Sequence, residues 1–431
     1  MKSSVAPAAI ALVIGLVLPG VGSSGASAQD VPRDAVPPAP TPVTIATLEM
    51  PAPGGLAWDA GTGRIVVPGT SDGVVRVIDA APWSVAAEIA TDVPGQTLVQ
   101  MFPGRGRAYV VGREPIVSVI DVAAGSLVTQ IPMNPEDINA TSTLISQADV
   151  PLLLVSFAPG ASPGAVALIS TETNFRRGTA VFPYETASLV IPRDRTMLIS
   201  SSPGSGSVLF LDTFFQPFAE VPVGGAPLRV AASADGARIY VSNPDSGRID
   251  VIDTDRAVLV GSIEIGAGVT DFALSPSGNG LAALVPATGE IVNVDLTTAQ
   301  VVTRGKIGEE PVGVTYGSDD RVVYVADRSG NAAMAVDLLH EPPAAPRLVR
   351  VKTRETSARV SWRAPVNEGT SPVVRYRVTT TPKAGSCVTR KTSCTIQGLK
   401  PGRSYRFRVV AETAVTSSTP AVSKPARIPR R

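Results

Sequence analysis

The sequence predicts an all-β protein in which a seven-bladed β-propeller is followed by a smaller β-sandwich. Three observations predict this fold class. A phrase of two strands joined by a tight turn recurs about every 42 residues. Each repeat holds four short runs rich in valine and isoleucine, and residues 346–431 follow a separate, non-repeating strand pattern. No segment holds the 3.6-residue apolar period of an amphipathic helix.

The repeat is clearest between Arg238 and Asp253, where an apolar strand, a Ser-Gly turn and an alternating strand follow one another. An aspartate ends nearly every copy, and its side chain is expected to accept hydrogen bonds from nearby backbone amides. The strand-ending residues are Asp79, Asp121, Ser170, Asp212, Asp253, Asp295 and Asp337. The copy ending at Ser170 follows the longest interval and lacks the aspartate, so the third repeat is predicted to be irregular.

The two ends of the repeat region predict how the ring closes. The seventh repeat has only three strand-like runs before Pro342-Pro343 ends it. The segment Val43–Glu49 matches the fourth strand of the other repeats, and we expect it to complete the last blade. Closure of this kind leaves no exposed sheet edge. The propeller is therefore assigned to residues 43–340.

One segment of the repeat carries a family resemblance. Tyr240-Val241-Ser242-Asn243 resembles the tetrapeptide that gives the YVTN-type β-propeller family its name, and Tyr324–Asp327 is a looser copy. The resemblance covers residues 43–340. It implies the propeller fold and a secreted or surface-layer protein, and some distant relatives in such a family are lactonases or lyases.

Residues 346–431, after a short linker at 341–345, resemble a fibronectin type III domain, an immunoglobulin-like β-sandwich. Trp362 lies where that family places its core tryptophan, and the segment Leu399–Val409 matches its tyrosine-corner motif. The resemblance implies that the ring of Tyr405 is buried and that its hydroxyl bonds back to the chain.

The chain ends and the cysteines indicate an export route. Residues 1–28 have the positive start, short apolar run and small-residue cleavage site of a secretory signal peptide, and proline-rich residues 29–42 read as a linker. We expect no membrane insertion. Cys387 and Cys394 are predicted to form a disulfide. The expected location is extracellular or cell-wall associated, and the composition resembles that of an actinobacterium.

The net charge of +1 hides a division between the two parts. Residues 346–431 hold 19 basic and 3 acidic residues, a net charge of +16, whereas residues 29–345 hold 18 basic and 34 acidic residues, a net charge of −16. Strand alternation places four arginines of the C-terminal part on one solvent-facing surface. They are Arg375, Arg377, Arg406 and Arg408.

Guanidinium groups pair with carboxylates and phosphates, so this surface predicts an anionic cell-wall or extracellular polysaccharide as partner. Two alternatives stay open: a merely solvated face, and docking on the acidic propeller. A protein partner for the propeller is also considered. The expected compartment argues against nucleic acid, and a monomer is expected.

A second candidate site lies at the mouth of the propeller channel, on loops that lead into the innermost strands. Arg229 and Asp271 occupy matching positions in adjacent repeats, and Glu136 and Asp137 lie on another such loop. Carboxylates there could hold a cation or act as acid and base. The alternative interpretation is a salt bridge that lines the channel.

Catalytic motifs are scarce in the sequence. The chain has one histidine, His340, which we interpret as a junction residue rather than a base, and no cofactor or metal is expected. The leading interpretation is a non-enzymatic binding or scaffold protein with the basic module as a tether. A carbohydrate-active enzyme of glycosidase type, or its accessory, is the first alternative. A metal-dependent, lactonase-like hydrolase is the second.

Overall fold

The computed structural model describes residues 40–102, 104–134, 140–145, 152–157, 164–181, 184–193 and 196–430 of the 431-residue chain. The predicted leader and most of the predicted linker lie outside these ranges. Apart from one short 3-10 turn, η1 (Pro203–Ser205), every regular element in the described ranges is a β-strand. No helix in these ranges is long and apolar enough to cross a membrane.

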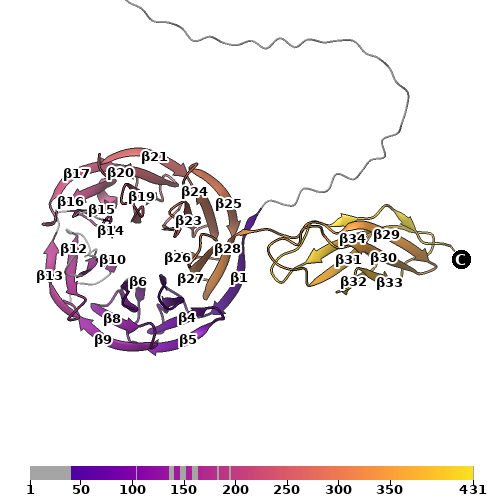
Figure 1. Cartoon of the computed structure of the whole chain (residues 1–431), viewed down its shortest axis with the longest axis horizontal. Helices are drawn as coiled ribbons and strands as arrows, with labels where there is room; N and C mark the ends of the chain where they lie inside the picture. Colours follow the sequence, from indigo (N-terminus) through magenta and orange to yellow (C-terminus); the bar gives the residue numbers. More distant parts are fainter. Residues whose placement is uncertain are drawn as a thin grey trace, which may run out of the picture. The chain divides into compact units, whose positions relative to one another are not determined.

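Residues 41–340 form antiparallel sheets of four strands, arranged in a ring (Figure 1). The described part of the chain contains seven such sheets. The first is β2 (Ala57–Asp59), β3 (Arg64–Pro68), β4 (Val74–Ala80) and β5 (Trp83–Ala90); the second is β6 (Gln96–Phe102), β7 (Arg107–Gly112), β8 (Ile116–Asp121) and β9 (Ser126–Pro132); the third is β10 (Ala140–Ile145), β11 (Leu152–Phe157), β12 (Ala165–Ser170) and β13 (Phe175–Val181). The fourth is β14 (Ser188–Val190), β15 (Leu198–Ser202), β16 (Ser207–Leu211) and β17 (Pro217–Pro222); the fifth is β18 (Val230–Ala232), β19 (Arg238–Asn243), β20 (Arg248–Asp253) and β21 (Val258–Glu264); the sixth is β22 (Asp271–Leu274), β23 (Gly280–Val285), β24 (Glu290–Asp295) and β25 (Gln300–Lys306).

The seventh sheet is completed from the other end of the sequence. It consists of β26 (Pro311–Tyr316), β27 (Val322–Asp327), β28 (Ala332–His340) and β1 (Thr41–Glu49). Strand β1 runs antiparallel to β28, with Thr44 opposite Val336 and Glu49 opposite Ala332. The prediction that the N-terminal strand closes the last blade is confirmed. The strand starts at Thr41, two residues before the predicted start of the propeller.

The position of a strand within its sheet determines how apolar it is. The middle strands are almost entirely buried, as in β23, where Leu281, Leu284 and Val285 are at most 2% exposed. Both faces of these strands pack against neighbouring sheets, so continuous apolar runs suit them. The outermost strands, such as β21, are largely exposed. These outermost strands lie on the outside of the ring (Figure 1), so the exposed positions form its rim.

The turn between the middle strands explains the glycine of the repeat. Gly247 joins β19 to β20 with φ of +69°, in the left-handed region that favours glycine. A Cβ atom at this position would lie 2.7 Å from the backbone nitrogen of Ala267, so a side chain would also collide with the next turn.

The aspartates that end the repeats cap turns and also hold arginines. Asp253 accepts the backbone N–H of Arg256 at 3.0 Å and pairs with Arg238 of the neighbouring strand at 2.6 Å. The hydrogen bond from Arg256, followed by that from Arg238, holds the pKa of Asp253 below its usual range. The same cross-strand pair recurs as Arg64–Asp79 and Arg321–Asp337. These carboxylates therefore belong to the fold of each blade.

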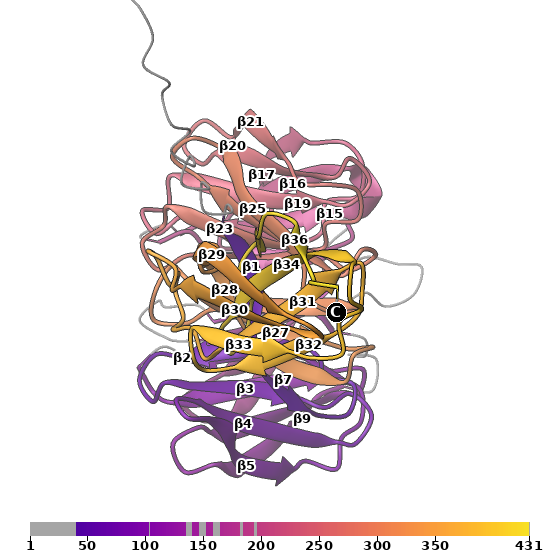
Figure 2. The same ribbon diagram turned by 90° about the vertical axis from the view of Figure 1, so that its right-hand side faces the viewer.

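The C-terminal part is a two-sheet sandwich, whose strands are coloured orange to yellow in Figure 2. The three-stranded sheet consists of β29 (Arg347–Arg354), β30 (Ser357–Arg363) and β33 (Ser393–Ile396). The second sheet has the order β32 (Ser386–Thr389), β31 (Arg375–Thr381), β34 (Ser404–Glu412) and β35 (Ala421–Val422), and β36 (Ala426–Arg427) also pairs with β34.

Aromatic side chains from both sheets fill the sandwich. Trp362 of β30 packs edge-on against Tyr376 of β31, with ring centroids 5.4 Å apart. Tyr405 and Phe407 of β34 are at most 2% exposed. The hydroxyl of Tyr405 accepts the backbone N–H of Lys400 at 3.2 Å, which ties the start of β34 to the preceding turn.

Candidate functional site

The channel-mouth candidate contains one ion pair between adjacent blades. Arg229 precedes β18 and Asp271 begins β22, and Arg229 Nε lies 3.5 Å from Asp271 Oδ1. The Asp271 carboxylate also accepts the backbone N–H of Val314 at 3.3 Å. Burial raises the pKa of Asp271, and Arg229 opposes the shift. Glu136 and Asp137 lie outside the described residues.

This pair has the geometry of the salt bridge that the sequence left as an alternative. Asp271 already has a cation and a backbone donor, so few of its lone pairs face a ligand. Within the described ranges, no group of three or more His, Cys, Asp or Glu side chains is placed to hold a metal ion. A role of Arg229 and Asp271 in binding remains a prediction.

The seam between the first and seventh sheets contains a stack of three aromatic rings. Tyr324 of β27 stacks with both Trp58 and Trp83, and its ring centroid lies 5.4 and 5.6 Å from theirs. A small pocket beside the stack is lined by Trp83, Tyr324 and Asp319. The rings face one another and pack in the core between the blades. The stack thus stabilises the closure that β1 completes.

The four predicted arginines do lie on one surface of the C-terminal sandwich. We call the outward side of β31 and β34 the five-strand face; its charged residues are Arg375, Arg377, Arg406, Arg408 and Glu412. The four arginines are exposed. The pairing register places Arg408 opposite Thr379 and Arg406 opposite Thr381. Among the described residues, neither Arg406 nor Arg408 has an ion pair or a side-chain hydrogen bond.

Glu412 pairs with two of the four arginines on this surface. The Nε atoms of Arg375 and Arg377 each donate to a different oxygen of Glu412 at 2.6 Å. The Glu412 side chain is only 10% exposed. The hydrogen bond from Arg377 lowers the pKa of Glu412 most, partial burial opposes it, and the bond from Arg375 lowers the pKa further. Two of the four predicted arginines are therefore already occupied by a carboxylate of the same sheet.

The disulfide joins the two sheets of the sandwich. Cys387 lies on β32 and Cys394 on β33, and these strands belong to different sheets. The predicted Cys387–Cys394 bond is confirmed. It fastens the edge of the sandwich where β32 leads into β33.

Comparison with known proteins agrees with this sandwich. Residues 344–424 match the family model of the fibronectin type III domain. The C-terminal module is a fibronectin type III domain. A stretch of 104 residues is 35% identical to part of a titin homolog of Caenorhabditis elegans; the match covers 22% of this chain and 1% of that protein.

Two solved structures superpose on about two thirds of this chain. Hydrazine synthase of Kuenenia stuttgartiensis superposes with a TM-score of 0.59 at 17% identity, over 68% of this chain and 97% of that one. The Cps50 (Swd1) β-propeller domain of Myceliophteria thermophila superposes with a TM-score of 0.56 at 10% identity, over 69% and 99%. At these identities the likeness concerns the fold alone, which is all-β with a β-propeller.

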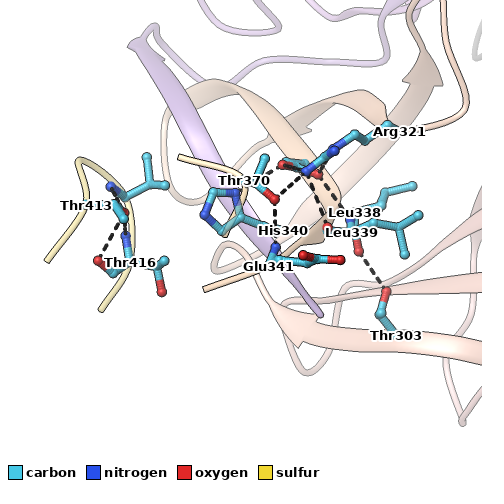
Figure 3. Close-up of polar contacts among 11 residues, drawn as sticks. Thr303, Arg321, Leu338, Leu339, His340, Glu341, Thr370, Thr413 and Thr416 are labelled. Carbon is cyan, nitrogen blue, oxygen red and sulfur yellow. Dashed lines mark hydrogen bonds and ion pairs between the residues drawn. The ribbon is translucent and has the colours of Figure 1, made fainter. Parts of the chain in front are cut away.

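His340 lies at the end of the propeller, and its neighbours bond to the fibronectin type III domain. It is the last residue of β28, is 1% exposed, and its Nδ1 lies 3.1 Å from Asp337 Oδ2. Thr370 of the domain accepts a hydrogen bond from Arg321 at 2.7 Å and one from the backbone N–H of Glu341 at 2.9 Å (Figure 3). The histidine therefore holds a structural carboxylate rather than solvent or a substrate.

Sequence reasoning missed Glu412, although a signal for it was present. The alternation on β34 was followed only to Val409, whereas the strand continues to Glu412. The same parity that turns Arg406 and Arg408 outward also turns Glu412 outward. Extending the strand by three residues would have placed the acid among the arginines.

Proposed function

We propose that this protein is a secreted, non-enzymatic binding or scaffold protein. In this proposal the propeller is a rigid interaction platform, and the basic fibronectin type III domain tethers it to anionic cell-wall or extracellular polymers. A propeller joined to a fibronectin type III domain fits a binding or scaffold role. The observation that carries the tether is the net charge of residues 346–431, which is +16. Most of the basic side chains lie on strands and are exposed.

The physical basis of the tether is many weak contacts acting together. A single exposed ion pair contributes roughly 1 kcal/mol or less. A polymer with regularly repeated charges can meet several arginines at once, and each further contact forms at high effective concentration. Binding of this kind releases counterions, so it must weaken steeply as salt is raised.

Three further features are part of the same proposal. The seven described sheets, with β1 closing the last, support a seven-bladed ring of the YVTN type. The leader-like residues 1–28 and the disulfide support export from a bacterial cell. In the same proposal the protein acts as a monomer, and only the basic domain contacts the polymer, since an anionic polymer repels the acidic propeller.

Co-sedimentation with cell walls tests the tether. The purified protein is mixed with intact walls, and with walls from which the anionic polymers have been extracted, at salt concentrations from 50 to 500 mM. We expect binding to intact walls at low salt, its loss at high salt, and little binding to extracted walls. Equal binding to both preparations, or binding that salt does not change, would contradict the proposal.

A further inference from the structure

The second sheet of the fibronectin type III domain carries more uncompensated charge than the five-strand face. Strand β29 alternates between buried and exposed positions, and Val349 and Val351 pack into the core. Strand β30 buries Ala358, Val360 and Trp362. Alternation therefore turns the basic residues from Arg350 to Arg363 outward, and Arg347, which lies beyond a register irregularity, is exposed as well. We call this surface the three-strand face; it consists of Arg347, Arg350, Lys352, Arg354, Arg359 and Arg363.

The register of this sheet places like charges directly opposite one another. Lys352 of β29 pairs with Arg359 of β30, and Arg347 pairs with Arg363. Like charges at directly opposed positions destabilise a sheet. A fold that needed only solubility could separate these charges or alternate their signs. Their arrangement points to a role outside the fold.

Among the residues that the structure describes, no carboxylate on β29, β30 or β33 offsets the three-strand face as Glu412 offsets the other. On its third strand, Thr395 lies opposite Arg359 and Ser393 lies opposite Ser361. The acid nearest in sequence, Glu355, lies in the turn after β29 rather than on a strand. Among the described residues, no ion pair joins any of the six basic side chains to a carboxylate. The face is thus a dense array of positive charge with hydroxyl groups between.

The sheet also sets the spacing of the charges. Residues two apart on one strand lie about 7 Å apart, and neighbouring strands lie about 4.8 Å apart. Arg350, Lys352 and Arg354 therefore form a row with a regular repeat, and Arg359 and Arg363 form a second row beside it. Because the backbone is held in a sheet, little order is lost when a ligand binds. A linear polymer with regularly spaced anions fits such rows.

The face has no group that would read bases or sugar rings. The aromatic residues of the domain, such as Trp362, Tyr376 and Tyr405, are buried in its core. Recognition of single-stranded nucleic acid relies on exposed aromatic rings on which bases stack. Leu348 is an exposed apolar side chain of β29, and the other outward side chains of the face offer positive charge and hydroxyl groups. They suit a ligand that is recognised by its charges alone.

From these observations we infer that the three-strand face is the polymer-binding surface of the domain, and that its ligand is a flexible linear phosphodiester polymer. The inference rests on the proposed function and locates it on a different sheet from the arginines that the sequence singled out. A guanidinium group can donate two parallel hydrogen bonds to two oxygens of one phosphate. The serine and threonine hydroxyls between the arginines can donate further hydrogen bonds.

A pair of matched variants tests the location. Lys352→Ser with Arg359→Ser removes two charges from the three-strand face, and Arg406→Ser with Arg408→Ser removes two from the five-strand face. Binding of a fluorescent glycerol-phosphate decamer to the full-length protein is measured over a salt series. For about six contacts we expect a slope of log K against log salt near −4, at about −0.7 per contact.

The two variants must differ for the inference to stand. We expect the Lys352/Arg359 variant to bind at least tenfold more weakly, with a slope shallower by about 1.4, and the Arg406/Arg408 variant to change less than twofold. Loss confined to the Arg406/Arg408 variant, or equal loss in both, overturns the location but leaves the tether in place. If the wild type binds neither the decamer nor intact walls, the tether itself is overturned.

Two other probes test the chemistry of the ligand. Tighter binding of polygalacturonate or of an oligo-dT strand than of the decamer overturns the assignment to a phosphodiester polymer recognised by charge. Salt-sensitive self-association without any polymer, abolished by the Lys352/Arg359 changes, would instead assign the face to the acidic propeller of a second copy. The inference is supported if both competitors bind more weakly than the decamer and if the protein stays monomeric at all salt concentrations.

A charge reversal separates binding from folding. Arg359→Glu replaces a like-charged cross-strand pair with an opposite one, so the melting temperature should rise while decamer binding falls. A variant that binds less and is more stable has not lost binding through unfolding. A fall in melting temperature would remove the argument from opposed charges and overturn the inference.

Discussion

The propeller and the fibronectin type III domain use arginine in opposite ways. In the propeller, arginines at the start of a middle strand pair with the aspartate that ends the next strand, as in Arg64–Asp79 and Arg238–Asp253. In the domain, 19 basic residues accompany only 3 acidic ones. The six of the three-strand face lie side by side and form no ion pair within the described part of the chain. The propeller's charges belong to its fold, and the domain's surplus is available to a partner.

The largest expected effect comes from breaking a paired charge in the propeller. Asp337 binds Arg321 through both oxygens and also contacts His340, and its side chain is 5% exposed. Burial alone would raise the pKa of Asp337, but hydrogen bonds from Arg321 and His340 lower it overall. Asp337→Ala should therefore cost about 3 kcal/mol, because the buried His340 loses its acceptor and the half-exposed Arg321 loses its partner.

Denaturant unfolding of the propeller measures this cost. The control is Asp295→Ala, since Asp295 ends the sixth repeat and accepts hydrogen bonds from Thr297 without an arginine partner. That change should cost about 1 kcal/mol. Similar costs for the two variants would show that the arginine pair adds nothing to the fold of the blade.

The next effect concerns how each part is closed. The propeller closes by pairing β1 with β28, whereas the domain closes its edge with the Cys387–Cys394 bond. Replacing both cysteines by serine should cost the domain about 2–3 kcal/mol in the chain-entropy account of a short loop. Calorimetry should show a lower transition for the domain and an unchanged one for the propeller. A shift of both transitions would indicate that the two parts unfold together.

Glu412 pairs with arginines of its own domain, as the repeat-ending aspartates do in the propeller. Glu412→Gln should cost about 1–2 kcal/mol, since two charge-assisted hydrogen bonds are weakened at a site that is open to water on the arginine side. Because the pKa of Glu412 is lowered in the folded state, its contribution is present above about pH 4.5 and is lost as pH falls further.

Urea titrations at pH 7 and pH 3 test this pH dependence. The wild type should lose more stability than Glu412→Gln between these two values, so the difference between them should shrink at pH 3. A difference that stays constant with pH would mean that the carboxylate is not held ionised by Arg375 and Arg377.

The smallest effect has the opposite sign. Lys352→Glu places an acid opposite Arg359 and should stabilise the domain by about 0.2–1 kcal/mol. The matched control is Arg408→Glu, because Arg408 lies opposite Thr379 and Val422 rather than a like charge. Thermal unfolding should show a higher transition for Lys352→Glu only. Stabilisation by both changes would reflect reduced net charge rather than the opposed pair.

Much of the fold was predictable because the repeat is local. Spacing alone located the blades, and the missing strand after Asp337 predicted that β1 would close the ring. The fold of the C-terminal domain followed from Trp362 and the segment around Tyr405. These signals depend on residues close together in the sequence, or on the number of strands in one repeat compared with the other repeats.

The site was predicted only in part because pairing depends on register. Alternation along β34 correctly turned Arg406 and Arg408 outward, but the partners of Arg375 and Arg377 lie on a strand that begins 29 residues after Arg375. The opposed charges of β29 and β30 follow from a pairing register that contains an irregularity between Arg347 and Arg350. The composition predicted that the positive charge lies in the C-terminal domain. The pairing of the strands was needed to tell which face of that domain has basic residues without acidic partners.

Arginine footprinting tests the central claim most directly. The full-length protein is treated with phenylglyoxal with and without the glycerol-phosphate decamer, and modification at each arginine is read by mass spectrometry. We predict that the polymer protects Arg350, Arg354 and Arg359, and leaves Arg406, Arg408 and the exposed arginines of the propeller unchanged. Protection of the five-strand face or of the propeller instead would contradict the account.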